Sequence, residues 1–243
     1  VHVITPILVV TSNQKAALPF RSAEELLRLS ENTGKALWEL AIDYEQARSG
    51  WYSNEIKDYM RFVIETMEKG IQTALKGDIQ MNGVLEPTAG KINQFMKTDQ
   101  RALDMGILNL MVPWSMATME CSSAMGVVLC APTGGSAGVF PGAVLGAATM
   151  LGLDMEEKIK LMLTTSVIGI VMSKDCNYSA ELYGCQVEPG AASAMAAGAL
   201  VFMMNGRPEQ SLMAASCALQ NILGTICDPV AGLVQLPCIS RNA

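Results

Sequence analysis

Histidine is nearly absent from this 243-residue chain, which contains only His2. Zinc sites built on two or three histidines, Ser-His-Asp triads and Cys-His pairs all need an imidazole within the fold, and His2 lies almost at the terminus. Charge is also scarce, since Asp, Glu, Lys and Arg make up 16 % of the residues and the formal net charge is −6. Because phosphate binding needs a basic surface, we expect no nucleic-acid partner.

Closely spaced cysteine pairs are missing as well. The chain has seven cysteines, an odd number, and no two of them form a C-x-x-C pair. A secreted scaffold held by disulfides is therefore a poor interpretation. The seventeen methionines, which oxidation would damage, favour a reducing interior, and we expect the protein in the cytoplasm.

Half of the residues are hydrophobic, so the chain can bury a sizeable core. Residues 121–153 carry no charge, and that length is sufficient to span a bilayer. However, the stretch contains two prolines and seven glycines, mostly between Pro132 and Gly142. They would leave backbone groups unsatisfied in lipid, so we expect a tightly packed protein interior and no membrane association.

Charged residues are distributed unevenly, with 27 in residues 1–120 and 13 in residues 121–243. The first part is typical of surface helices and the second of a core. Alternation of β-branched residues is scarce throughout, which predicts an all-α fold. We expect one compact, multi-helix domain over residues 1–243, with 1–20 as a peripheral segment and with Gly- and Pro-rich breaks lining a site.

Periodic apolar residues and end signals predict the helices. A capping box at Ser22–Glu25 opens a short helix, and turn-rich residues 82–91 predict a loop. The other expected helices are Lys35–Arg48, Asn54–Leu75, Arg101–Leu129 with a bend at Pro113, Ala143–Leu151, Met155–Met172, Ala191–Met204 and Pro208–Leu223.

Three segments of the second half are too rich in Gly and Pro to be helical, namely residues 131–142, 183–190 and 227–238. In an otherwise helical core, such interruptions tend to line a functional site. The last two contain Cys185, Cys227 and Cys238. Stiff, non-helical backbone at these positions can fix thiolates around a metal.

Spacing alone leaves two interpretations of these three thiols open. Three soft ligands without histidine favour an iron–sulfur cluster over zinc. Alternatively, they are ordinary buried cysteines, because the 41 and 10 intervening residues match no generic metal-binding pattern. Cys121, Cys130 and Cys217 lie in apolar runs expected to be helical, and we interpret them as small core residues.

The first Gly-rich segment also predicts an anion site. Its glycines expose backbone N–H groups, its hydroxyl side chains add donors, and the apolar run that follows brings a helix N-terminus nearby. This arrangement suits a substrate carboxylate, and the alternative is a plain turn between helices. The candidate donors are Thr133, Gly134, Gly135, Ser136 and Gly138.

Isolated charges in the charge-poor half are further candidates. A buried charge needs a partner or a metal, and an arginine can bind a substrate carboxylate through two hydrogen bonds. For the glutamates and the arginine, a solvated surface position is the simpler alternative. These residues are Glu120, Glu181, Glu188, Asp228 and Arg241.

Taken together, these segments resemble the α subunit, or catalytic domain, of the iron–sulfur-dependent L-serine dehydratases. The resemblance covers residues 22–243 and is most specific over 227–238, which reads CDPVAGLVQLPC and is followed by ISRNA. It also includes APTGGSAG at 131–138, Gly-Cys-Gln at 184–186 and TGKALWE at 33–39. It implies an all-α catalytic domain in which Cys185, Cys227 and Cys238 hold a [4Fe–4S] cluster and residues 133–138 bind the substrate carboxylate.

The activity implied by the resemblance is β-elimination of L-serine. An iron with an open position polarises the β-hydroxyl, a base removes the Cα proton, hydroxide departs, and the enamine hydrolyses to pyruvate and ammonia. In that family the candidate base is a histidine of the other domain or of a separate β subunit. Because His2 is unsuitable, we expect such a partner, within an oligomer.

The chain departs from the family pattern at four positions. Ser122 and Ala124 replace an Asn and a Ser, Leu182 stands where a glutamate precedes the cysteine by three, and Tyr183 replaces a small residue. A changed polar contact can shift specificity by orders of magnitude. Other functions therefore stay open: elimination from another β-substituted amino acid such as L-cysteine, a non-catalytic metal-stabilised binding module, and a metal-free helical scaffold.

Overall fold

The computed structural model describes residues 16–99 and 101–243. Within these ranges all regular structure is helical, apart from one isolated bridge between Val230 and Leu233. The all-α prediction is confirmed. Most of the predicted peripheral segment 1–20, including His2, lies outside the described residues. In the part that is described, no helix combines the length and apolar character needed to cross a membrane.

Eleven α-helices, one 3₁₀ turn and one π-helical turn form the regular structure of the described chain. They are α1 (Ala23–Thr33), α2 (Leu37–Ser49), α3 (Ser53–Leu75), α4 (Ala89–Thr98), α5 (Leu108–Ser123), the 3₁₀ turn η1 (Gly134–Ser136), the π-helical turn η2 (Phe140–Leu145), α6 (Gly146–Met150), α7 (Met155–Met172), α8 (Ala180–Tyr183), α9 (Pro189–Met203), α10 (Pro208–Gln220) and α11 (Gln235–Asn242).

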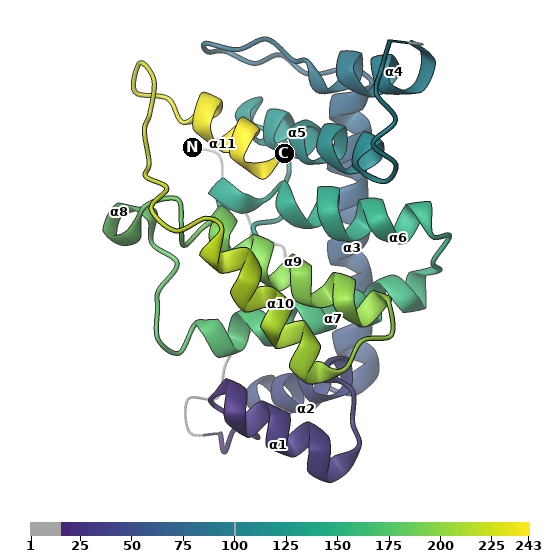
Figure 1. The fold of residues 1–243 in the computed structure, drawn as a ribbon, viewed down its shortest axis with the longest axis vertical. Coiled ribbons are helices and arrows are strands. Elements are labelled where there is room, and N and C mark those ends of the chain that lie inside the picture. Colours follow the sequence, from purple (N-terminus) through teal and green to yellow (C-terminus); the bar gives the residue numbers. More distant parts are fainter. Residues whose placement is uncertain (1–15, 100) are drawn as a thin grey trace, which may run out of the picture.

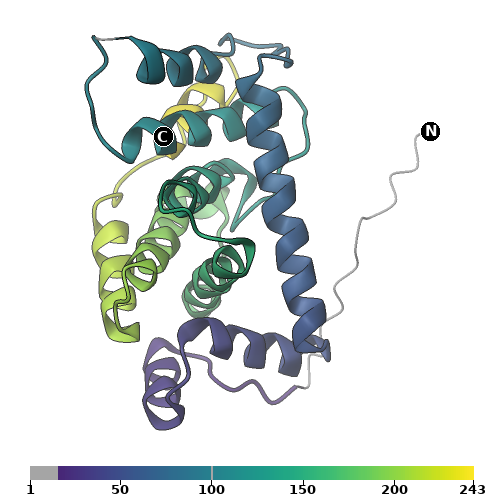
Figure 2. The same ribbon diagram turned by 90° about the vertical axis from the view of Figure 1, so that its right-hand side faces the viewer.

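The long helix α3 runs along one side of the molecule (Figures 1 and 2). At one end lie α1 and α2, and at the other lie α4, α5 and α11. Between these ends, α9 packs against α7, α10 and η2. The apolar second half of the chain therefore forms the centre of the molecule, as its low charge predicted.

Small side chains allow α9 to occupy this central position. Ala192 and Ala199 are fully buried. A Cβ atom added to Gly198 would lie 2.2 Å from Cδ1 of Ile168 in α7 and 3.0 Å from the carbonyl oxygen of Ser211 in α10. Since cores are packed to crystal-like density, only a glycine at this position lets the three helices approach so closely.

The predicted helix from Arg101 to Leu129 is wrong at both ends. The chain turns at Gly106, where φ is +60°, and α5 begins at Leu108. At the other end Met125 also has φ of +60°, and the N–H of Gly126 donates to the carbonyl oxygen of Cys121 at 2.8 Å. This left-handed termination closes α5 at its C-terminal end. The helix α4 was not predicted at all.

The helix starts follow local capping chemistry more closely. The Ser22 hydroxyl accepts the N–H of Glu25 at 3.2 Å, as predicted. The reciprocal half of that capping box differs, because the Glu25 carboxylate accepts the N–H of Arg21 at 2.6 Å. Asp154 caps α7 with a complete box to Glu157, and this helix has the predicted bounds.

Candidate functional site

All three Gly- and Pro-rich segments contain helical residues, which contradicts the prediction that none is helical. The first includes η1 and the start of η2, the second only the end of α8 and the start of α9, and the last the start of α11. Cys238 lies in α11, so the prediction that it sits on non-helical backbone is wrong. Pro237 occupies the third position of that helix, where a missing N–H has no intrahelical partner to lose. The helix packs on α5, beside the segment that contains η1 (Figure 1).

Asn242 fastens α11 to the glycine segment. Its Oδ1 accepts the N–H of Gly138 at 3.0 Å, and its Nδ2 donates to the carbonyl oxygens of Gly135 at 2.7 Å and Cys238 at 2.8 Å. The carbonyl oxygen of Asn242 also accepts the hydroxyl of Ser115 in α5. Sequence reasoning missed this buried residue, which gave no signal beyond its place in the family-like segment.

The five predicted anion donors divide into two groups. Ser136 is fully buried, and its hydroxyl pairs with that of Thr133 at 3.1 Å, while the N–H of Gly138 is occupied by Asn242. A Cβ at Gly138 would lie 2.6 Å from the carbonyl oxygen of Ser115, so this glycine serves packing. The N–H groups of Gly134 and Gly135 have no acceptor among the described residues.

The segments that carry Cys185 and Cys227 pass in contact with each other. Gly184 has φ of +72°, and a Cβ there would lie 3.0 Å from the carbonyl oxygen of Thr225 and 3.8 Å from the nitrogen of Cys227. Glycine meets both constraints, because it tolerates the positive φ and lets the two backbones approach. Cys185 is buried at this crossing, and Cys227 is exposed.

The three predicted thiols form one electrostatic cluster. Burial raises the pKa of Cys185, and the charges of Cys227 and Glu188 add to the effect. Burial also raises the pKa of Cys238 to about 11, with further contributions from Cys185, Glu188 and Cys227. The charge of Cys227 therefore reaches both Cys185 and Cys238, and the charge of Cys185 reaches Cys238.

Arg241 contacts the thiol of Cys185 and the segment on either side of Cys227. Its guanidinium donates to Sγ of Cys185 at 3.1 Å, pairs with the carboxylate of Asp228 at 2.8 Å and donates to the carbonyl oxygen of Ile226. The hydrogen bond to Cys185 lowers the pKa of that thiol against the effect of burial. These contacts within the chain occupy the guanidinium of Arg241, which was a candidate for binding a substrate carboxylate.

The donor set fits an iron–sulfur cluster. Within residues 16–99 and 101–243, no three His, Cys, Asp or Glu side chains are grouped so as to hold a single metal ion. A four-iron cluster is larger than an ion, and each cysteine binds a different iron, so its thiolates surround it rather than meet at one point. Two thiols that feel the charge of the third, beside an arginine, are donors of the kind that such a cluster takes.

A cavity of about 410 Å³ lies between the glycine segment and α11. Gly134 and Gly135 line it together with Cys238, and so do Ser122 and Ala124, two of the four positions that depart from the family pattern. The other two departures, Leu182 and Tyr183, are exposed on α8 and are absent from its lining. The first pair is therefore placed to influence what binds.

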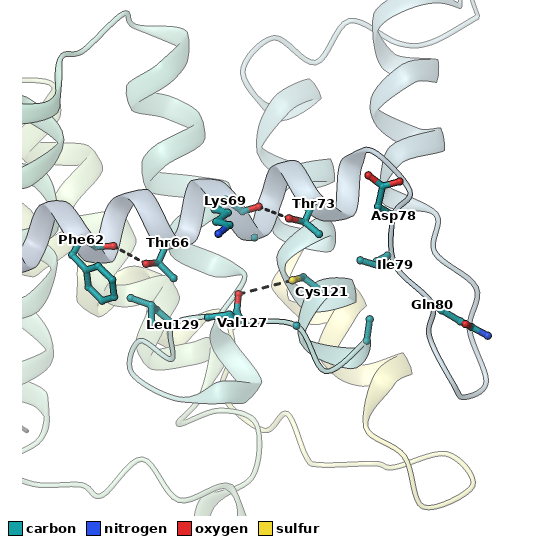
Figure 3. A pocket seen from close by; sticks show the side chains of 13 residues that line it. Phe62, Thr66, Lys69, Thr73, Asp78, Ile79, Gln80, Cys121, Val127 and Leu129 are labelled. Carbon is teal, nitrogen blue, oxygen red and sulfur yellow. Dashed lines mark hydrogen bonds between the residues drawn. The ribbon is translucent and has the colours of Figure 1, made fainter. Parts of the chain in front are cut away.

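A larger cavity of about 540 Å³ lies between α3 and the chain after α5 (Figure 3). The hydroxyls of Thr66 and Thr73 there bond to carbonyl oxygens of their own helix, and Sγ of Cys121 faces the carbonyl oxygen of Val127. None of the three Gly- and Pro-rich segments lines this cavity. Its last lining residue is Leu129, which precedes the first of them. The candidate site is therefore the smaller cavity.

The cysteines interpreted as core residues have different environments. Cys121 is buried in α5, which confirms its prediction, and burial raises its pKa. Cys130 and Cys217 are exposed, so their predictions are wrong. Cys130 follows the early end of α5, and Cys217 lies on the outer face of α10.

Of two glutamates for which a solvated position was the simpler alternative, one is buried and the other is exposed. Glu120 is 1 % exposed, which contradicts a solvated position; its carboxylate accepts the N–H groups of Thr88 and Ala89 at 2.7 and 3.0 Å. It thereby caps α4 from a different helix. Glu181 is exposed and accepts the hydroxyl of Ser179 at 2.6 Å.

Comparison with known proteins gives a consistent result. A family model described as "Serine dehydratase alpha chain" matches residues 32–243. The chain is 34 % identical over 224 residues to the "Probable L-serine dehydratase, alpha chain" of Bacillus subtilis (strain 168), covering 92 % of this chain and 74 % of that protein. It is 32 % identical over 223 residues to the "L-serine dehydratase, alpha chain" of Peptoniphilus asaccharolyticus, with coverage of 91 % and 76 %.

A third relative is longer. The "L-serine dehydratase 1" of Escherichia coli (strain K12) is 33 % identical over 231 residues, which cover 93 % of this chain and 50 % of that protein. The chain thus spans about three quarters of two proteins named as alpha chains and half of this longer relative.

Proposed function

Because the chain belongs to the serine dehydratase alpha chain family, we propose that it catalyses, in the cytoplasm and with a partner, the β-elimination of L-serine to pyruvate and ammonia. The observation that carries this proposal is the cavity in which the free N–H groups of Gly134 and Gly135 lie beside Cys238. Such a cavity is of a size to admit a small amino acid.

A [4Fe–4S] cluster held by Cys185, Cys227 and Cys238 is the cofactor of this proposal. When bound, such a cluster with an open iron supplies a Lewis acid for the substrate's β-hydroxyl. Arg241 supports the thiolate form of Cys185 by its hydrogen bond to Sγ, and its ion pair with Asp228 keeps the 226–228 segment beside that thiol. Cluster loading therefore depends on a preformed contact between two parts of the chain.

The glycine segment binds and orients the substrate. In this proposal the N–H groups of Gly134 and Gly135 donate to the substrate carboxylate, and Thr133 and Ser136 shape the turn by their mutual hydrogen bond. Asn242 joins this turn to Cys238 by the hydrogen bonds of one amide. The distance between the carboxylate and the cofactor end of the cavity is thus fixed by a short, rigid connection.

The base that removes the Cα proton lies on a partner in this proposal. The described residues contain no histidine, since His2 falls outside them. Two relatives are named as alpha chains, and a third relative is about twice as long as the matched region, so a β subunit or a second domain can supply the missing group. The exposed side of Cys227 leaves the cluster end open to such a partner.

A second candidate substrate follows from Ser122 and Ala124. Both line the cavity and both depart from the family pattern, so elimination of sulfide from L-cysteine on the same scaffold is the alternative. Anaerobic assays of ammonia, pyruvate and sulfide over a panel of β-substituted amino acids separate the two. No turnover of any of them, with the partner subunit present, contradicts both.

Serine substitutions test the proposed cofactor. Replacing Cys185, Cys227 or Cys238 with Ser is expected to abolish the visible absorbance, the iron and sulfide content and the activity of anaerobically prepared enzyme, because each removes one ligand. Cys217→Ser and Cys121→Ser are the controls and are expected to retain all three, since both lie outside the cluster. Equal loss from all five variants would contradict the ligand assignment.

A further inference from the structure

Glu188 lies at the junction of the two parts of the candidate site. It immediately precedes α9, whose N-terminal end favours negative charge. Its carboxylate rests against Gly135: a Cβ added to that glycine would lie 2.6 Å from Oε2 and 2.8 Å from Oε1. The absence of a side chain at Gly135 is what lets the carboxylate approach the glycine segment.

The same carboxylate is close to the thiols. Its negative charge raises the pKa of Cys185 and of Cys238, which places it within electrostatic reach of both. Gly135 and Cys238 line the same cavity. Glu188 is not in the lining of that cavity, but its carboxylate rests against Gly135, which is, and it lies within electrostatic reach of Cys185 and Cys238.

Among the described residues, Glu188 has no cationic or hydrogen-bonding partner. The other acidic groups of this region are engaged: Asp228 pairs with Arg241, and Glu120 accepts N–H groups of α4. Arg241, the nearest guanidinium of the cluster, is occupied by Asp228, Cys185 and the carbonyl oxygen of Ile226. A half-buried carboxylate without a partner is costly unless a ligand neutralises it.

We propose that Glu188 binds the α-ammonium group of the amino-acid substrate. This inference rests on the proposed function and deepens it. An α-amino acid carries its carboxylate and ammonium on the same carbon, so a carboxylate site at Gly134 and Gly135 places the ammonium within a few bonds of Glu188. The two charges then pair in a partly desolvated site.

Specificity follows from this arrangement. The substrate carboxylate is held by the glycine segment, the ammonium by Glu188, and the β-substituent faces the thiol end of the cavity. Three fixed attachments around one carbon distinguish the two mirror-image forms of an amino acid. Glu188 thus sets the requirement for a free α-amino group, whereas the residues near Ser122 influence which β-substituent is accepted.

A pair of ligands and an isosteric variant test the proposal. The anaerobic enzyme with its partner subunit is assayed for the KM and kcat of L-serine and for the inhibition constant of 3-hydroxypropanoate, which lacks only the amino group. Glu188→Gln is expected to raise the KM of L-serine roughly 10- to 100-fold, since it removes one charge-assisted hydrogen bond. The inhibition constant of 3-hydroxypropanoate is expected to stay the same or fall, because a negative charge near this anion is removed.

Two further variants make the test selective. Glu65→Gln removes the same charge from the exposed face of α3 and is expected to change neither constant. Gly135→Ala keeps Glu188 but places a methyl group where its carboxylate lies. This variant is expected to weaken the binding of L-serine more than the binding of 3-hydroxypropanoate. Iron content and melting temperature are measured for each variant, so that a folding defect in Glu188→Gln is recognised. If Glu188→Gln shows such a defect, Glu188→Asp is tested in its place.

The outcomes distinguish the two levels of inference. Equal weakening of both ligands by Glu188→Gln, or no change in either, overturns the role of Glu188 and leaves the proposed function standing. A loss of iron without selective loss of L-serine binding assigns Glu188 to the cofactor instead and also overturns it. If the wild-type enzyme binds and converts no β-substituted amino acid, the proposed function fails and this inference fails with it.

Discussion

Replacement of Asn242 by Ala is expected to destabilise the fold far more than the loss of one small side chain near the end of a helix suggests. The amide makes three hydrogen bonds, to the N–H of Gly138 and to the carbonyl oxygens of Gly135 and Cys238. Each such bond contributes about 0.5–1.5 kcal/mol net, and a buried N–H left unpaired costs more. If the contributions add, the free energy of unfolding falls by roughly 2–4 kcal/mol.

The measurement is urea unfolding followed by far-ultraviolet circular dichroism on the metal-free chain. Asn221→Ala is the matched control, because the amide of exposed Asn221 makes a single hydrogen bond, to the carbonyl oxygen of Cys217 at 2.8 Å within its own helix. The control is expected to change stability by less than about 0.5 kcal/mol. Equal effects of the two variants would refute the idea that Asn242 joins α11 to the glycine segment.

Two further outcomes are expected. Because burial raises the pKa of Cys185, and that of Cys238 from 9.0 to about 11, the metal-free fold favours the neutral thiols; its stability is complete below about pH 9 and falls as the pH rises toward 11. Urea unfolding across this range measures the fall, which Cys238→Ser should reduce, and an undiminished fall in that variant contradicts the assignment. Gly198→Ala is expected to cost about 1–3 kcal/mol because the added methyl meets Ile168. A thermal melt that matches that of Ser216→Ala, on the exposed face of α10, would disprove this packing argument.

Helices whose ends are marked by local chemistry were predictable from the sequence. The helix α7 has the predicted bounds because Asp154 and Glu157 form a capping box, and its sequence contains no Gly-Pro break before Met172. The end of α5 was not predictable in this way. It depends on a left-handed conformation at Met125, a residue type that gives no such signal.

The candidate site shows the same division. The cysteines and the glycine segment were found because Gly and Pro interrupt the helical second half of the sequence there, and the family resemblance then suggested their roles. The role of Asn242 and the capping contacts of Glu120 were missed because their partners are distant in the chain: Gly138 lies 104 residues from Asn242, and Thr88 lies 32 residues from Glu120. No local periodicity encodes such hydrogen bonds. They form only when the packing of α5 brings the segments together.

The position of α11 has a consequence for biosynthesis. Ribosomes extend proteins from the N-terminus, and α11 follows every other described helix in the chain. While it is still inside the exit tunnel, the nascent chain lacks Cys238 and the amide that aligns the glycine segment. Delivery of iron before this helix has emerged would therefore meet an incomplete ligand set, and maturation of the proposed centre belongs to the period after its emergence.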